Sequence, residues 1–139
     1  MNNKLKKTLV VLLLAVFCIA GFSTFARAEE DNIVVSLGAN LSDQQRKEIL
    51  ALFGVEEGEV KILEVTNQEE RNYLEGLVSD EKIGKRAISS AYVEILEEGE
   101  GISVETRNIN WVTKEMYANA LVTAGVENAR VIAAAPFAV

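Results

Sequence analysis

The chain has 139 residues, a formal net charge of −7, one cysteine and no histidine. The cysteine, Cys18, lies in an N-terminal apolar run, so the rest of the chain has neither thiol nor imidazole. This excludes disulfides, thiol nucleophiles, imidazole bases and thiolate or imidazole metal sites there. The acidic balance lacks the electrostatic footprint for nucleic acid or anionic lipid.

The first 28 residues have the three parts of a secretory signal peptide. Lysines begin the chain, residues 9–22 form an apolar run, and a small-residue pattern ends at Ala28. We predict cleavage between Ala28 and Glu29. The fourteen-residue run is shorter than the roughly 20 residues that span a bilayer, which disfavours an uncleaved anchor. We therefore expect a secreted protein, extracellular and associated with the cell envelope, without membrane insertion after cleavage.

The predicted mature part, residues 29–139, suits one domain. Four of the 14 basic residues and none of the 21 acidic ones lie in the leader, so the mature part would carry a charge of −11. A domain of this length buries about 60 to 70 per cent of the surface that its unfolded chain exposes. Packing alone can therefore supply the core, without disulfides.

A strand, a helix and a second strand are predicted first. Residues 33–37 are apolar and rich in β-branched side chains, which predicts a strand buried on both faces. Ser42 as N-cap and Gly54 as left-handed stop predict a helix over residues 43–53. Its inward side chains should be Ile49, Leu50, Leu52 and Phe53. With a second strand over residues 60–65, this makes a βαβ unit with parallel strands and a right-handed crossover.

The middle of the chain predicts a helix and a β-hairpin. Thr66 and Glu69 form a capping-box pattern, so a helix should run from there to about residue 77. After a polar connection, residues 87–97 alternate, and the side of Ala87 and Val93 is the more apolar, so it should face the core. A glycine turn and a returning strand over residues 102–109 complete the hairpin signal.

A capped helix over residues 114–124 and a strand over residues 129–134 end the chain. The order is therefore β-α-β-α-β-β-α-β, with two βαβ units and a β-hairpin. Parallel crossovers must bury their helices on a sheet face, so we predict an α/β fold with a mixed sheet and helices packed on it.

Residues 41–62 repeat as residues 112–133, without a gap. Ser42 matches Thr113, and identical residues follow at Leu50 and Leu121, Gly54 and Gly125, Val55 and Val126, Glu56 and Glu127, and Val60 and Val131. The repeat can come from duplication or from two instances of one generic βαβ solution.

Two polar strand-to-helix junctions form the predicted ligand site, because open α/β sheets bind ligands at the carboxyl ends of their strands. The residues are Asn67, Glu69 and Arg71 at the first junction and Asn110, Trp111, Thr113 and Glu115 at the second. If the two units pack side by side, both junctions open on one side of the sheet. Helix capping is the alternative role of Glu69 and Thr113.

A serine–lysine pair is the remaining candidate for nucleophilic chemistry. On a strand, Lys85 and Ser89 would lie about 13 Å apart, taking roughly 3.3 Å per residue. The pair would need a bend near Gly84, and a solvated basic turn is the favoured interpretation. The acidic turn at residues 97–100 lacks the Asp and Asn spacing of calcium loops. We therefore assign no catalytic residue, metal or cofactor.

Three stretches carry a resemblance to a known family: VTNQEERNYL, EKIGKRAISSAYVEIL and NINWVTKEMYANALVTAGVENARVIAAAPF. Through them the chain resembles the domain of unknown function 1002 family, the YpuA-like exported proteins of Gram-positive bacteria. The resemblance implies an envelope-associated protein without an established activity. It also implies a truncated or N-terminal version, because family members continue into a further helical part.

The sequence predicts an exported cell-envelope module that is a non-enzymatic binding or structural domain for a wall component or a protein partner. The alternative is a histidine-free hydrolase or ligand-processing domain that uses Ser89, Lys85, Glu69 or Glu70. A perturbed carboxylate or lysine in a pocket beside these residues would favour the alternative, and a flat surface would favour the binding module.

Overall fold

The computed structural model describes residues 32–74, 76, 79–110 and 112–139. The strands are β1 (Ile33–Gly38), β2 (Lys61–Val65), β3 (Ser90–Ile95), β4 (Ile102–Arg107) and β5 (Ala129–Ala134). The helices are α2 (Asp43–Phe53), α3 (Asn67–Leu74), α4 (Asp80–Ile83) and α5 (Lys114–Thr123). The predicted leader, Cys18 and the cleavage position lie outside the described residues.

The predicted class and element order are confirmed, with the single-turn α4 added in the polar connection. All five strands form one sheet in the order β2-β1-β3-β5-β4, and β3 alone runs antiparallel to its neighbours. Within the described ranges, no helix has the length and apolarity needed to cross a membrane.

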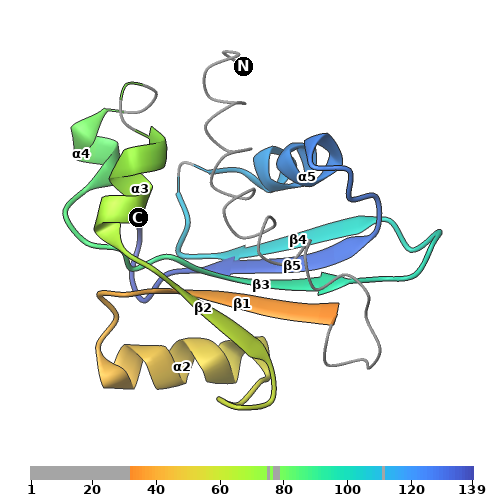
Figure 1. Cartoon of the computed structure of the whole chain (residues 1–139), viewed down its shortest axis with the longest axis horizontal. Coiled ribbons are helices and arrows are strands. Elements are labelled where there is room, and N and C mark those ends of the chain that lie inside the picture. The colour runs from red at the N-terminus through yellow and green to blue at the C-terminus, as the bar shows by residue number, and fades with distance from the viewer. Residues whose placement is uncertain (1–31, 75, 77–78, 111) are drawn as a thin grey trace.

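Helices α2 and α5 cover opposite faces of the sheet (Figure 1). Alternation along each strand sends side chains to both faces, so two separate core clusters form. One cluster packs α5 on Val34, Val93 and Val131. The other packs α2 on the neighbouring residues Val35, Tyr92 and Ile132. The central strands are therefore buried on both sides, as expected for β1.

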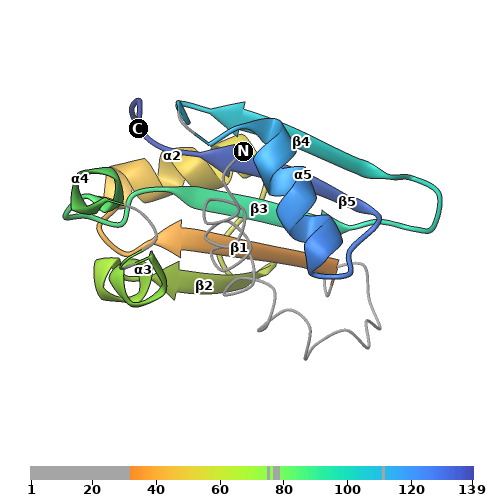
Figure 2. The same ribbon diagram turned by 90° about the horizontal axis from the view of Figure 1, so that it is seen from above.

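The two βαβ crossovers have opposite hands. From β1 to β2 and from β4 to β5 the chain steps in the same direction across the sheet, and all four strands point the same way. Because α2 and α5 lie on opposite faces, only one crossover can be right-handed. Figures 1 and 2 show that β1-α2-β2 has the predicted right hand and that β4-α5-β5 has the rare left hand.

The predicted β-hairpin of residues 87–97 and 102–109 does not form, because β5 lies between β3 and β4. Burial explains the difference. Strand β5 is apolar on both faces and buried at five of its six positions, whereas β4 alternates between partly buried and exposed residues. The doubly apolar strand takes the central position, and the alternating strand takes the edge.

Two burial predictions also need correction. The Ala87 and Val93 side of β3 was expected to face the core alone, but Tyr92 on the other side is equally buried. The reason is that β3 lies centrally between β1 and β5, with a helix on each face. Leu52, expected to point inward, is 38% exposed, since the buried stripe of α2 is Ile49, Leu50 and Phe53.

The sequence repeat corresponds to the same helix C-cap, made twice. Gly54 and Gly125 both adopt a left-handed conformation, with φ of 73° and 86°. The amide of Val55 donates to the Leu50 carbonyl at 3.1 Å, and that of Val126 donates to the Leu121 carbonyl at 2.9 Å. This is the Schellman motif, in which glycine supplies the left-handed residue and a hydrophobic contact accompanies the cap.

The identities therefore mark a shared helix–turn–strand segment. The whole βαβ units cannot be superposed, since no rotation changes the hand of a crossover.

Candidate functional site

Both predicted junctions lie at one end of the sheet, as expected. Strands β2 and β4 run in the same direction, so their carboxyl ends share that end. They are, however, the two edge strands of the sheet. Four strand spacings of about 4.8 Å separate them by about 19 Å. A small ligand can contact one junction or the other, but cannot bridge both.

At the β2 junction, Thr66 and Glu69 form the predicted capping box. The Glu69 amide donates to Thr66 Oγ1 at 3.1 Å, and the Thr66 amide donates to Glu69 Oε2 at 2.8 Å. These bonds satisfy backbone donors that the first turn of α3 would otherwise leave free. The Glu69 carboxylate is thus engaged with its own backbone.

Asn67 and Arg71 join α3 to the end of α4 through the carbonyl of Gly84. Arg71 Nη2 donates to this carbonyl oxygen at 2.6 Å, and Asn67 Nδ2 donates to it at 3.3 Å. Arg71 Nε also donates to Asn67 Oδ1 at 3.1 Å. A carbonyl at a helix end has no partner within its helix, so these side chains supply one. We call Asn67, Arg71 and Gly84 the brace.

Glu70 lies beside the brace and is half-buried. Its Oε2 accepts a hydrogen bond from Asn67 Nδ2 at 3.2 Å. Burial raises the pKa of the Glu70 carboxyl, and the hydrogen bond from Asn67 and the positive charge of Arg71 oppose this increase without cancelling it. Glu70 is therefore the carboxylate in this region whose environment favours the neutral form.

At the β4 junction, Thr113 caps α5. Its Oγ1 accepts a hydrogen bond from the Met116 amide at 3.2 Å. The Asn110 amide donates to the carbonyl of Val139 at 2.6 Å, and Glu115 is exposed in the first turn of α5, where the helix dipole favours a carboxylate. Trp111 lies outside the described residues.

The serine–lysine pair is not assembled. Lys85 and Ser89 are both exposed, and no hydrogen bond joins them within the described parts of the chain. The neighbour of Ser89, Ser90, is buried, and its Oγ accepts a hydrogen bond from the Gly38 amide at 3.3 Å. A Cβ on Gly38 would lie 2.3 Å from the Ala87 carbonyl oxygen, so glycine lets the two chains approach here.

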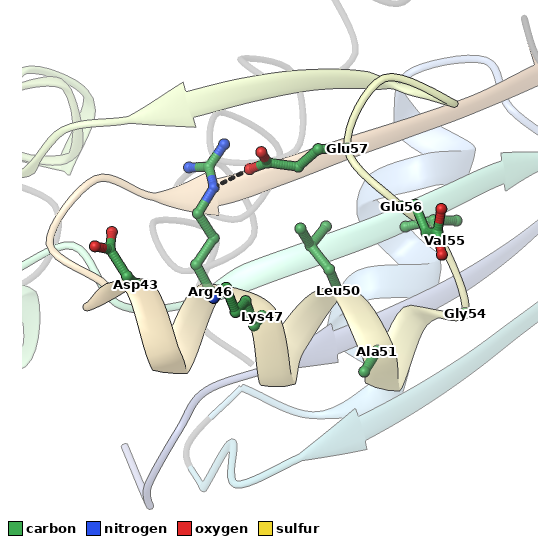
Figure 3. Close-up of a pocket in the computed structure, with 9 residues that line it drawn as sticks. All are labelled: Asp43, Arg46, Lys47, Leu50, Ala51, Gly54, Val55, Glu56 and Glu57. Carbon is green, nitrogen blue, oxygen red and sulfur yellow. Dashed lines mark hydrogen bonds and ion pairs between the residues drawn. The ribbon is translucent and has the colours of Figure 1, made fainter.

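An open hollow of about 670 Å³ lies along α2 and the turn that follows it (Figure 3). Its lining combines apolar and charged residues: Asp43, Arg46, Lys47, Leu50, Ala51, Gly54, Val55, Glu56 and Glu57. The sequence prediction missed it, because its two sides meet only when the chain turns back at Gly54. The available signal was the spacing of Asp43, Arg46, Lys47 and Leu50, which places them along one side of a helix.

Arg46 reaches from α2 to two carboxylates, that of Glu57 in the lining of the hollow and that of Glu64 on β2. Its Nε is hydrogen-bonded to Glu57 Oε1, and its Nη1 lies 2.8 Å from Glu64 Oε1 (Figure 3 shows the pair with Glu57). The hydrogen bond to Glu57 raises the pKa of Arg46 above its ordinary value. Lys47 is a second, exposed cation in the lining.

The described residues contain no group of three or more acidic, cysteine or histidine side chains that could hold a metal ion. The polar residues at the carboxyl end of the sheet thus form helix caps and the brace. The hollow lies elsewhere, along α2. None of the seven residues of the predicted ligand site lines it.

Comparisons with known proteins give a family but no established activity. The family model described as "Protein of unknown function (DUF1002)" matches residues 37–139. The chain is also 43% identical over 116 residues to the "Uncharacterized protein YpuA" of Bacillus subtilis (strain 168). That match covers 84% of this chain and 40% of the relative, so the chain spans less than half of the relative's length. No solved structure matches.

Proposed function

This chain belongs to the DUF1002 family of proteins of unknown function, and we propose that it is an exported, non-enzymatic binding module of the cell envelope. Its ligand would be a wall component or a protein partner. The leader pattern of residues 1–28 supports export. The absence of histidine and cysteine from residues 29–139 supports a binding role, since it removes two common nucleophile and base types.

The observation that carries the proposal is that polar groups at the carboxyl end of the sheet already have structural partners. Glu69 and Thr113 cap helices, and Asn67 and Arg71 hold the Gly84 carbonyl. Catalysis by a side chain needs a nucleophile and a base within hydrogen-bond reach. Ser89 and Lys85, which could have formed such a pair, are both solvent-exposed and are not bonded to each other.

The hollow along α2 is the surface that best suits a ligand. Leu50, Ala51 and Val55 give it an apolar part, and Arg46, Lys47, Asp43, Glu56 and Glu57 give it charges of both signs. Ligand sites combine apolar walls with a few polar groups that fix orientation. A ligand that carries apolar groups and charges of both signs, such as a short peptide or a peptide-bearing wall fragment, would match this lining.

Glu70 is the observation that favours the alternative, a histidine-free hydrolase. A carboxyl group whose pKa is raised by burial can act as a general acid. Yet neither Glu70 nor Ser89 lines the hollow, so the candidate acid lies apart from it. The binding module is therefore the better-supported function.

The proposal is tested by incubating the exported protein with purified cell-wall and envelope-protein fractions, and measuring both bound protein and released soluble fragments. We expect retention without release. Ala51→Trp, which fills the hollow from an exposed position on α2, should abolish retention. Val122→Trp is the matched control, because Val122 is 59% exposed on α5 and the hollow is not lined by α5.

Release of soluble fragments would support the hydrolase instead. A folded protein that both fractions fail to retain would overturn the binding module. Equal retention of both tryptophan variants would remove the hollow from the proposal.

A further inference from the structure

Strand β4 is an edge strand whose outer side has no strand partner within the described residues. Its inner side is bonded to β5, where the Gly101 and Arg107 carbonyls accept hydrogen bonds from Ala129 and Ala135. In a parallel pair, the backbone N–H and C=O groups of every second residue point to the neighbouring strand. The odd-numbered residues of β4 are therefore the ones that are hydrogen-bonded to β5. The backbone groups of Ile102, Val104 and Thr106 therefore point outward.

The usual protections of an edge strand are weak here. β4 has six consecutive residues, and it contains no proline and no lysine. Natural edges are blunted by such residues, by bulges or by covering segments, because bare strand edges recruit other chains. The remaining protection is the exposed pair Glu105 and Arg107, whose side chains lie 3.3 Å apart.

The side chains of β4 define two different faces for an added strand. Ile102 and Val104 are partly buried and pack against the core cluster under α5. On the other face Ser103, Glu105 and Arg107 are exposed. An extended partner would therefore need alternating side chains, with apolar residues on the α5 face and polar residues on the other.

Charge decides between a second copy of this chain and a different partner. Residues 97–107 contain four glutamates and one arginine. Two copies would bring these acidic segments together, and each mature part would carry a charge of −11. A segment with lysine or arginine at its polar positions would instead be attracted to Glu105 and to the acidic turn before β4.

We propose that the outer edge of β4 binds an extended, basic segment of a protein partner, which adds a sixth strand to the sheet. This rests on the proposed binding function and gives that module a protein partner, at a surface separate from the hollow along α2. Main-chain hydrogen bonds to Ile102, Val104 and Thr106 supply affinity, and the alternation of apolar and basic side chains supplies specificity.

The test uses a synthetic peptide, acetyl-Val-Lys-Val-Lys-Val-Lys-Val-amide, and a version with glutamate in place of lysine. We expect the lysine peptide to bind and the glutamate peptide to bind at least about tenfold more weakly. N-methylation of one alternating set of peptide amides should abolish binding, because those amides face β4, and N-methylation of the other set should leave it. This comparison leaves the protein unchanged, so it does not depend on the folding of a variant.

Val104→Pro gives the complementary test from the protein side, since the Val104 amide points away from β5. It should weaken binding of the lysine peptide by at least about tenfold, whereas Ile62→Pro, at an outward-facing position of the other edge strand, should leave binding unchanged. Circular dichroism checks that each variant is folded.

The edge would be overturned as the binding site if N-methylation of either set of peptide amides abolished binding equally. The same holds if neither set of N-methyl groups reduced binding. A dimer in sedimentation that Val104→Pro disrupts would assign the edge to a second copy and also overturn the inference. If the protein is retained on wall fractions but does not bind the lysine peptide, this inference alone is overturned and the proposed function stands.

Discussion

The two helix–turn–strand segments of this protein begin and end alike, yet they take different places in the sheet. Ser42 and Thr113 cap their helices with bonds of the same kind, and Gly54 and Gly125 end them with the same motif. After the first helix comes β2, an edge strand, and after the second comes β5, a central strand. The caps fix where each helix stops, and the strand that follows determines the position in the sheet.

The composition of the strands explains this difference. β2 carries Lys61 and Glu64, and none of its residues is fully buried. β5 contains Val131, Ile132 and three alanines, and Arg130 is its one exposed residue. A strand that is apolar on both faces is stabilised in the middle of the sheet, because both faces are buried there. A strand with charged side chains keeps its charges solvated at an edge.

The largest expected effect is on the free energy of unfolding, when a lysine is placed in β5 and, for comparison, in β2. Ile132→Lys should destabilise the protein by about 4 kcal/mol or more, because Ile132 is 4% exposed and the ammonium would be buried without a partner. Ile62→Lys, on the same face of the edge strand, should cost about 1 kcal/mol, since Ile62 is only partly buried. Urea unfolding measures both, and equal losses would contradict the central position of β5.

A smaller effect is expected at the two helix ends, where the segments should respond alike. Gly54→Ala and Gly125→Ala should each cost about 1 kcal/mol, because alanine is strained at positive φ and a Cβ meets nothing within 4 Å at either site. Replacement by asparagine should cost less, as asparagine tolerates this conformation. Thermal unfolding of the four variants checks the prediction, and a loss at one glycine only would show that the caps are not equivalent.

The smallest effect concerns Glu70, which lies beside the brace, and it depends on pH. Burial raises the folded-state pKa of Glu70, so its stabilising contribution is fully present below the ordinary glutamate pKa and is lost as the pH rises through the raised value. Glu70→Gln should therefore melt at a higher temperature than the wild type at pH 7, and the difference should shrink toward pH 4.

The exposed Glu81→Gln serves as the control for this change. A melting difference for Glu70→Gln that stays constant with pH would show that titration of Glu70 does not contribute to stability.

Local signals in the sequence were enough for the helices and for most strands. The caps at Ser42 and Gly54 predicted α2 with its observed bounds, and residues 129–134 were assigned correctly as a strand. The pairing of β4 could not be predicted in this way, since the turn at residues 99–101 favours a hairpin locally. The parallel β4–β5 pair depends on burial of β5 between two neighbours, which is a property of the whole sheet.

In the candidate site, too, local features could be predicted from the sequence and long-range contacts could not. Capping by Glu69 and Thr113 was foreseen as an alternative, because a capping box spans three residues. The brace joins Arg71 to Gly84, and Arg46 joins α2 to Glu57 and Glu64. These contacts connect residues that only the folded chain brings together, so no local pattern announces them.

The most direct test of an open edge at β4 is amide hydrogen exchange along this strand, measured residue by residue by NMR. We expect slow exchange at Ser103 and Glu105, whose amides face β5, and fast exchange at Val104 and Thr106, whose amides face outward. Addition of the lysine peptide should then protect Val104 and Thr106. Uniform protection along β4 in the free protein, or no change on adding the peptide, would contradict an open edge that binds a partner strand.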